Sequence, residues 1–210
     1  MGETTMNRLS FIAVALLITA LNILGCAQMS GLGPGWVTLI DGEKGLENFY
    51  RVGDANWRAE GGAIVADKGK GGHLVTKSSY RDFQLRAEFW ADHTTNSGIF
   101  IRITDPQKIT AVDASEVNIF DQRPGPEYGT GAIVNYAKVV PMPKAGGRWN
   151  TYEITAKGDH LVVVFNGAET VNIHNGKNPQ GPISLQFGNI PPKVLPGGAI
   201  KWRKVQIRPL

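Results

Sequence analysis

The chain has very little cysteine, few charged residues and no run of basic residues. Cys26 is its one cysteine among 210 residues, so an internal disulfide is excluded. Only 19% of the residues are charged, and the Lys and Arg that give the net charge of +4 are scattered. Proteins that bind nucleic acid typically concentrate basic residues in a patch or stripe. The composition therefore predicts no nucleic-acid partner.

Several common catalytic signatures are also missing. The sequence contains no Gly-x-Ser-x-Gly motif, no phosphate-binding loop and no dinucleotide fingerprint. Its four histidines do not have the paired spacing of zinc ligands, so a zinc site is not predicted. No stretch after the first 35 residues keeps a helical hydrophobic period over three turns.

What the chain does contain is glycine, proline and short alternating segments. It has 26 Gly and 12 Pro, a composition typical of many short strands joined by tight turns. Residues 83–89 alternate cleanly, and Asn166-Gly167 between two apolar runs is a strong hairpin signal. A change of parity between Trp202 and Val205 predicts a β-bulge. Further strands are expected at 36–40, 57–60, 63–66, 73–76, 132–134, 149–156 and 183–187. The pattern predicts an all-β protein with a two-sheet antiparallel β-sandwich in one domain.

The N-terminus has the features of a secretory targeting signal. An apolar run from Leu9 to Leu24 ends at Gly25 and Cys26, and Arg8 precedes it. This arrangement resembles the lipobox of bacterial lipoproteins, which implies cleavage after Gly25 and a lipid anchor on Cys26. A retained membrane helix is the alternative. We expect a signal peptide at 1–25, a flexible tether at 26–35 and the folded domain at 36–210, held to the membrane in the bacterial cell envelope, periplasmic or surface-facing.

Two neighbouring segments predict a working surface. In residues 96–102, the parity that places Ile99, Ile101 and Ile103 in the core places Gly98, Phe100 and Arg102 on the opposite face. In residues 116–121, Val117 and Ile119 are core, and Glu116, Asn118 and Phe120 share the other face. Aromatic rings beside an Arg, a Glu and an amide suit a polyhydroxylated ligand. A carbohydrate is therefore the expected partner.

An ordered series of motifs then resembles one family, the 3-keto-disaccharide hydrolase domain. The motifs are Trp57 with Glu-Gly-Gly-Ala-Ile at 60–64, Gly-His-Leu-Val-Thr at 72–76, Tyr-Arg-Asp-Phe-Gln-Leu at 80–85, 96–102, 116–121, Gly-Ala-Ile at 131–133, Arg-Trp-Asn-Thr-Tyr at 148–152, Phe-Asn-Gly at 165–167, 181–186 and 202–210. They run in order over the whole expected domain. The resemblance implies a concanavalin-like jelly roll that cleaves glycosides oxidised at C3 of the sugar.

The implied reaction assigns chemistry to the predicted surface. A C3 ketone acidifies the C2 proton, a base removes it, and the C1 substituent leaves by β-elimination. Glu116 is the expected base or metal ligand, and Arg102 the cation that holds an oxyanion; the alternative is an ion pair between the two. A divalent metal could stabilise the enolate, and its identity stays open.

The remaining candidates have weaker signals. Asp121 is a candidate metal or hydroxyl ligand or a turn cap, and His93 is a candidate acid or a surface histidine. Phe100 and Phe120 are expected to stack on sugar rings or to pack under a loop. The other expected substrate contacts are Asn96, Asn118, Tyr128, His73 and Gln186. Asn118 stands where the family usually has Gln, and no His follows Gln186, so a non-catalytic, lectin-like lipoprotein is the alternative function.

Overall fold

The computed structural model describes residues 35–190 and 195–210, which belong to one compact unit. The expected signal peptide, Cys26 and all of the expected tether before Gly35 lie outside the described residues, so they stay predictions. In the described part of the chain, no helix has the length and apolar character needed to cross a membrane.

The described residues form short strands and two single-turn 3₁₀ helices. In chain order the elements are β1 (Val37–Asp41), η1 (Leu46–Asn48), β2 (Phe49–Gly53), β3 (Arg58–Glu60), β4 (Ala63–Ala66), β5 (Gly72–Thr76), β6 (Phe83–Ala91), β7 (Ser97–Ile101), β8 (Ser115–Ile119), η2 (Pro126–Tyr128), β9 (Arg148–Lys157), β10 (His160–Phe165), β11 (Ala168–His174), β12 (Ser184–Phe187), β13 (Asn189–Ile190), β14 (Leu195–Pro196) and β15 (Ile200–Pro209).

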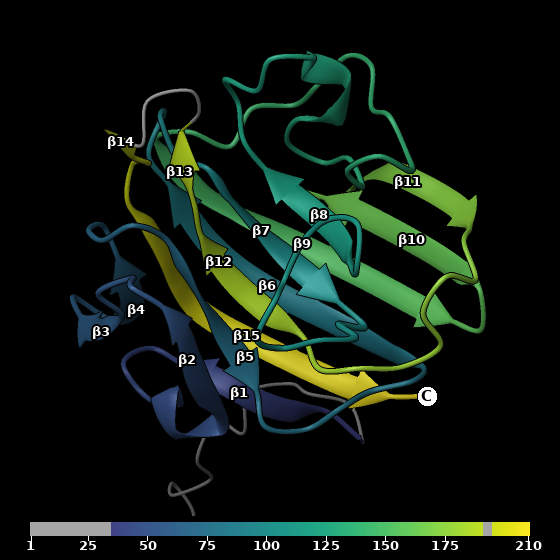
Figure 1. Cartoon of the computed structure of the whole chain (residues 1–210), viewed down its shortest axis with the longest axis horizontal. Coiled ribbons are helices and arrows are strands. Elements are labelled where there is room, and N and C mark those ends of the chain that lie inside the picture. Colours follow the sequence, from purple (N-terminus) through teal and green to yellow (C-terminus); the bar gives the residue numbers. More distant parts are fainter. Residues whose placement is uncertain (1–34, 191–194) are drawn as a thin grey trace, which may run out of the picture. The chain divides into compact units, whose positions relative to one another are not determined.

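The strands form two antiparallel sheets stacked face to face (Figure 1). The large sheet has the order β11-β10-β9-β6-β15-β4-β3, with β1 also paired to β15. The small sheet has the order β2-β5-β12-β7-β8. The predicted all-β, two-sheet antiparallel sandwich is therefore confirmed. Residues 132–134 are the exception among the expected strands, because they make only isolated bridges, from Ile133 to Val117 and to Ala137.

The core lies between the inner faces of the sheets and follows from strand alternation. In β6, Phe83, Leu85, Ala87 and Phe89 are buried, whereas Gln84, Arg86 and Glu88, which alternate with them, face outward. Phe89 stacks on Tyr152 of β9, with ring centroids 5.2 Å apart, and lies 5.5 Å from the ring of Trp202. Pairing of β15 with β6 shifts register between Trp202 and Lys204, which confirms the predicted bulge.

A second, smaller apolar cluster lies on the outer face of the small sheet. It contains Val75, Phe100, Ile103 and Ala114, with Ile109 packed against it. Ile103 and Ile109 belong to the segment between β7 and β8, which crosses the outer face of this sheet in Figure 1. The prediction that Ile103 joins Ile99 and Ile101 in the main core is wrong. Arg102 has a left-handed backbone (φ 55°), and this reverses the alternation after β7.

Candidate functional site

The outer face of the small sheet carries two rows of side chains that cross its strands. Strand pairing places Ser184 opposite both Val75 and Phe100, and Phe100 opposite Glu116. The second row contains His73 opposite Gln186, and then Gly98 opposite Asn118. Segments more than 100 residues apart in the sequence thus supply one polar patch. We call Glu116, Asn118, Gln186 and His73 the polar patch.

Glu116 is the buried carboxylate of the polar patch. It is only 7% exposed, and burial raises its pKa to about 7, although the positive charge of Arg123 opposes the shift. Within the described residues no group donates a hydrogen bond to its carboxylate. Its side chain lies over Gly98, where an added Cβ would stand 3.3 Å from Oε1. A carboxyl group with these properties exchanges a proton near neutral pH.

Two amide oxygens of the polar patch are buried without a donor. Asn118 Nδ2 donates to the carbonyl of Tyr128 at 2.7 Å, but within residues 35–190 and 195–210 neither Asn118 Oδ1 nor Gln186 Oε1 has a hydrogen-bond partner. Leaving such an oxygen unbonded costs about 1–3 kcal/mol, so it favours any ligand that brings a hydroxyl or a cation. The Tyr152 hydroxyl, which lies in the core, holds β8 in place because it donates a hydrogen bond to the Asn118 carbonyl at 2.6 Å.

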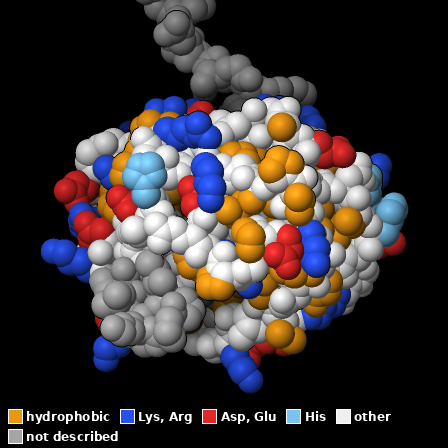
Figure 2. Space-filling model, turned by 90° about the horizontal axis from the view of Figure 1, so that it is seen from above, with side chains coloured by type: hydrophobic (Ala, Val, Ile, Leu, Met, Phe, Trp, Pro, Cys, Tyr) orange, Lys and Arg blue, Asp and Glu red, His pale blue; other side chains and the backbone are white. Residues whose placement is uncertain are grey.

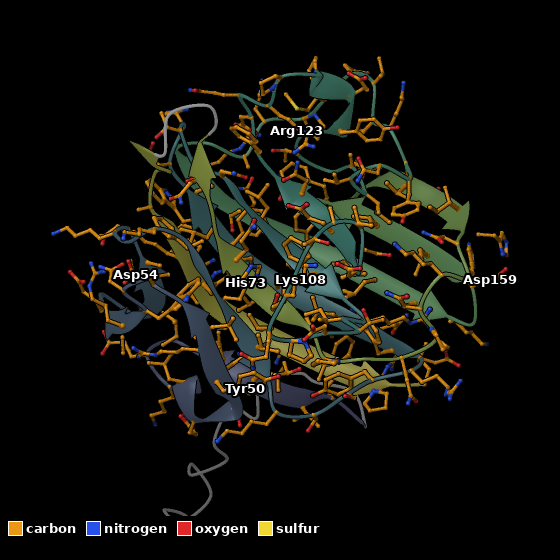
Figure 3. The ribbon with its side chains drawn as sticks, viewed as in Figure 1. Tyr50, Asp54, His73, Lys108, Arg123 and Asp159 are labelled. Atoms are coloured by element: carbon orange, nitrogen blue, oxygen red, sulfur yellow. The ribbon has the colours of Figure 1, made fainter. Side chains whose placement is uncertain are left out.

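His73 lies in the middle of the small sheet (Figure 3) and is held from two sides. Its Nδ1 is 3.0 Å from Ser184 Oγ, and its ring meets Phe100 edge-on with centroids 5.2 Å apart. Burial lowers the pKa of His73 to about 4, so the ring is neutral at pH 7. A neutral imidazole in this place can accept or donate a hydrogen bond, but it cannot act as a cation.

The two phenylalanines are not exposed sugar platforms. Phe100 is 2% exposed and Phe120 is 3% exposed. Phe100 packs against Ile103 and Ile109 of the segment between β7 and β8, as in the alternative expectation of packing under a loop. Tyr128 in η2 is partly exposed, carries Lys138 Nζ 5.5 Å from its ring centre, and lies at the Asn118 edge of the polar patch.

Arg102 is not on the working surface, so its expected meeting with Glu116 is wrong. Its guanidinium donates to the carbonyls of Arg81, Gly158 and Asn178. It also pairs with the Asp82 carboxylate at 3.2 Å, and it is only 3% exposed. The left-handed backbone that turns Ile103 outward also turns the Arg102 side chain away from the face of Glu116. Arg102 therefore ties distant loops together.

Asp121 caps a loop. Its carboxylate accepts hydrogen bonds from the backbone amides of Ala145 and Gly146 at 2.9–3.0 Å and from Thr130 Oγ1 at 2.7 Å. The turn-cap alternative for Asp121 thus fits its contacts. His93 is exposed and lies against Gly146 and Gly147, so it lines a depression of about 360 Å³ with Asp121 and does not join the polar patch.

We expect Asp121→Ala to lower the free energy of unfolding by roughly 2–3 kcal/mol, because it leaves the backbone amides of buried Ala145 and half-buried Gly146 without their charged acceptor. Urea unfolding would measure this loss. If the unfolding midpoint were unchanged and ligand binding or turnover were lost, Asp121 would be a site residue and not a cap.

Asn96 also works as a structural residue. Its Nδ2 donates to the carbonyl of Asn189, and its own carbonyl accepts a hydrogen bond from Gly188 N at 2.8 Å. An added Cβ at Gly188 would approach Asn96 to 3.0 Å, so the two backbones are in close contact. The expected substrate contact at Asn96 is therefore not supported by its geometry.

Sequence reasoning missed two members of the surroundings of Glu116. Ser184 has the same strand parity as Gln186, so its place beside His73 was readable from the alternation in 183–187. Arg123, in the loop beyond β8 (Figure 3), acts on Glu116 by its charge, and no sequence signal distinguished it from other loop arginines. Figure 2 shows such basic side chains interspersed with acidic and apolar ones.

The oxygens of the polar patch also define what metal could be held there. No group of three or more His, Cys, Asp or Glu gathers in a metal-binding arrangement among the described residues. The Glu116 carboxylate with the free oxygens of Asn118 and Gln186 is instead a mixed carboxylate and amide set, the ligand type of hard divalent cations.

We expect Gly98→Ala to lower turnover or ligand affinity by about 10- to 100-fold. An added Cβ would stand 3.0 Å from the Val117 carbonyl oxygen, which is backbone, and 3.2 Å from Glu116 Cγ, so the Glu116 side chain would have to move. Gly176→Ala is the control, since its nearest atom would be 3.5 Å away on the exposed Asp159 side chain. Equal activity of the two variants would contradict the placement of the site over Gly98.

Comparisons with known proteins agree with this fold. The class is the concanavalin-like jelly roll, with galectin-like and carbohydrate-binding structures among the neighbours. Residues 35–208 match the model of the 3-keto-alpha-glucoside-1,2-lyase-like domain, and the chain belongs to this family.

Solved structures are similar over most of the chain. A proposed glycosyl hydrolase from Parabacteroides distasonis is 25% identical with a TM-score of 0.66, covering 83% of this chain and 99% of its own. A second from the same organism is 16% identical, with a TM-score of 0.68 and coverage of 84% and 94%. The carbohydrate-binding module CBM66 from Bacillus subtilis is 12% identical, with a TM-score of 0.53 and coverage of 83% and 95%. Curated protein sequences gave no match. Family and neighbours together support a carbohydrate-related function.

Proposed function

We propose that this chain cleaves 3-keto-glycosides by removing the C2 proton and eliminating the C1 substituent. The observation that carries the proposal is Glu116, a buried carboxyl group without a donor and with a pKa of about 7. Membership of the 3-keto-alpha-glucoside-1,2-lyase-like family supports the proposed substrate class.

The proposed reaction needs only the substrate, the Glu116 carboxylate and one water molecule. The C3 ketone makes the C2–H acidic, and Glu116 in its ionised form takes this proton as the enolate forms. The electron pair then makes the C1–C2 double bond while the C1–O bond breaks, and the leaving oxygen takes the proton that Glu116 now holds, which returns Glu116 to its ionised form. Water added across the double bond gives the free keto-sugar. This route differs from the two-carboxylate mechanism of ordinary glycosidases.

The other residues of the polar patch bind and orient. Asn118 Oδ1 and Gln186 Oε1 lack donors, so they accept hydrogen bonds from sugar hydroxyls. Neutral His73 supplies one more hydrogen bond beside them. A divalent cation held by the Glu116, Asn118 and Gln186 oxygens would stabilise the negative charge of the enolate. Glu116 is only 7% exposed, so a substrate can contact it only at that small accessible part of the residue.

The test compares oxidised and unoxidised substrates of the same aglycone. We expect release of the aglycone from 3-keto-glucosides and none from the parent glucosides, measured on both anomers by chromatography. Binding of unoxidised glycans without turnover of any keto-glycoside would support the lectin-like alternative. Cleavage of the parent glucosides would place the chain among ordinary glycosidases and contradict the proposal.

A further inference from the structure

The outer face of the large sheet, on the opposite side of the sandwich from the polar patch, carries a groove of about 220 Å³. It crosses β6, β9 and β15. Its lining is polar and charged: Arg86, Glu88, Thr151, Glu153, Lys204 and Gln206, over the backbone of Ala87 and Tyr152. We call it the outer groove.

One end of the outer groove is aromatic and basic. Trp90 of β6 and Trp149 of β9 are direct cross-strand neighbours, and Lys201 of β15 is the other neighbour of Trp90. Lys201 Nζ lies 4.9 Å from the centre of the Trp90 ring, and the Arg203 guanidinium lies 4.3 Å from that of Trp149. Trp149 is 38% exposed, which is unusual for so large an apolar ring.

The other end repeats this composition. Trp36 is contacted by two guanidinium groups, that of Arg86 at 4.7 Å and that of Arg208 at 5.2 Å from its ring centre. Trp36 comes one residue before the Val37–Ile207 pair, level with Arg208 and therefore with Gln84, six residues before Trp90 on β6. The two aromatic ends are thus roughly 20 Å apart along the strands. That separation matches a short oligosaccharide better than a single sugar ring.

Charge in the outer groove is not balanced. Its carboxylates are each paired with a cation: Glu88 with Arg203 at 2.6 Å, Glu153 with Arg86 at 3.3 Å, and Asp41 with Lys204 at 3.5 Å. Lys201 and Arg208 have no acidic partner among the residues that the structure describes. One unpaired cation therefore stands at each aromatic end.

We propose that the outer groove binds an anionic oligosaccharide, one that carries uronate or sulfate groups. Trp90, Trp149 and Trp36 offer ring surfaces already held in place by cation–π contacts, so little side-chain entropy is lost on binding. Lys201 and Arg208 pair with the acidic groups, and Thr151 and Gln206 reach hydroxyls between them. The groove holds chains of glycan while the opposite face is free for catalysis.

The test measures binding of the full chain to polygalacturonate, with fully methyl-esterified pectin as the uncharged counterpart. We expect Trp90→Ala and Lys201→Gln each to weaken polygalacturonate binding by roughly tenfold. Lys177→Gln is the matched control, because Lys177 makes the same kind of contact with the Tyr136 ring elsewhere on the surface, at 5.4 Å. Lys177→Gln and Glu116→Gln should change binding less than about twofold.

Several results would overturn the proposal. These are equal binding of the esterified polymer, no effect of Lys201→Gln in a protein with unchanged circular dichroism, or loss of binding only in Glu116→Gln. The last measurement is binding of the protein to vesicles that contain phosphatidylglycerol. Binding of the parent chain to these vesicles, weaker binding of Lys201→Gln to them, and no binding of polygalacturonate would together show that the surface recognises anionic lipid and not glycan.

Discussion

Glu116→Gln is expected to lower kcat/KM for a 3-keto-glucoside by about 10²- to 10⁴-fold, the usual contribution of a general base. Glutamine keeps the shape that fits over Gly98, but it cannot take a proton. Burial costs should fall, because the variant no longer buries an ionisable group. Stability should therefore be equal or higher, and substrate affinity nearly unchanged, so the loss appears in kcat.

The pH dependence of kcat/KM is a second test of Glu116 as the base. Because the base must be ionised and its pKa is raised to about 7, kcat/KM should rise as the pH increases through about 7. An unshifted carboxylate would instead give a rise near 4.5. Glu127→Gln is the control, since Glu127 is a partly exposed glutamate of η2 paired with Lys138 at 3.7 Å. A parent-like rate in Glu116→Gln would remove Glu116 from the mechanism.

Arg102→Met is expected to have the largest effect on folding, a loss of about 3–5 kcal/mol in the free energy of unfolding. The guanidinium satisfies three backbone carbonyls and the partly buried Asp82 carboxylate at once. Methionine fills part of the space, but it removes the donor from the three carbonyls and leaves the Asp82 carboxylate with only the backbone amide of Gly158, at 2.8 Å. The left-handed backbone at Arg102 also loses the contacts that hold it.

Urea unfolding of Arg102→Met beside Arg81→Met would measure this effect. Arg81 is the exposed neighbour whose side chain bonds only Gln180 among the described residues, at 3.2 Å, and its loss should cost less than about 0.5 kcal/mol. If Arg102→Met kept its stability and lost turnover, Arg102 would have the oxyanion role first expected from its parity.

The strands and the hairpin between β10 and β11 were predictable because their signal is local. Alternation in 83–89 and the Asn166-Gly167 turn each depend on a few adjacent residues, and β6 and the β10–β11 hairpin follow them. The same alternation placed Glu116 and Asn118 correctly on the outer face of β8.

The contacts of those residues were less predictable. Parity counting assumes an extended backbone at every residue, and one left-handed residue, Arg102, reverses both its own side chain and Ile103. An ordinary Arg avoids this conformation, so only the tertiary hydrogen bonds explain it. His73 and Gln186 meet because β5 and β12 pair in the small sheet, which is a property of topology and not of either segment.

Deuterium incorporation at C2 tests the central claim most directly. A 3-keto-glucoside would be incubated with the protein in D₂O, and the sugar product analysed by NMR against a sample without protein. The elimination route predicts a product with deuterium at C2 for the parent chain and almost no product for Glu116→Gln. A released sugar that keeps its original C2 hydrogen would contradict proton abstraction at C2, and with it the role assigned to Glu116.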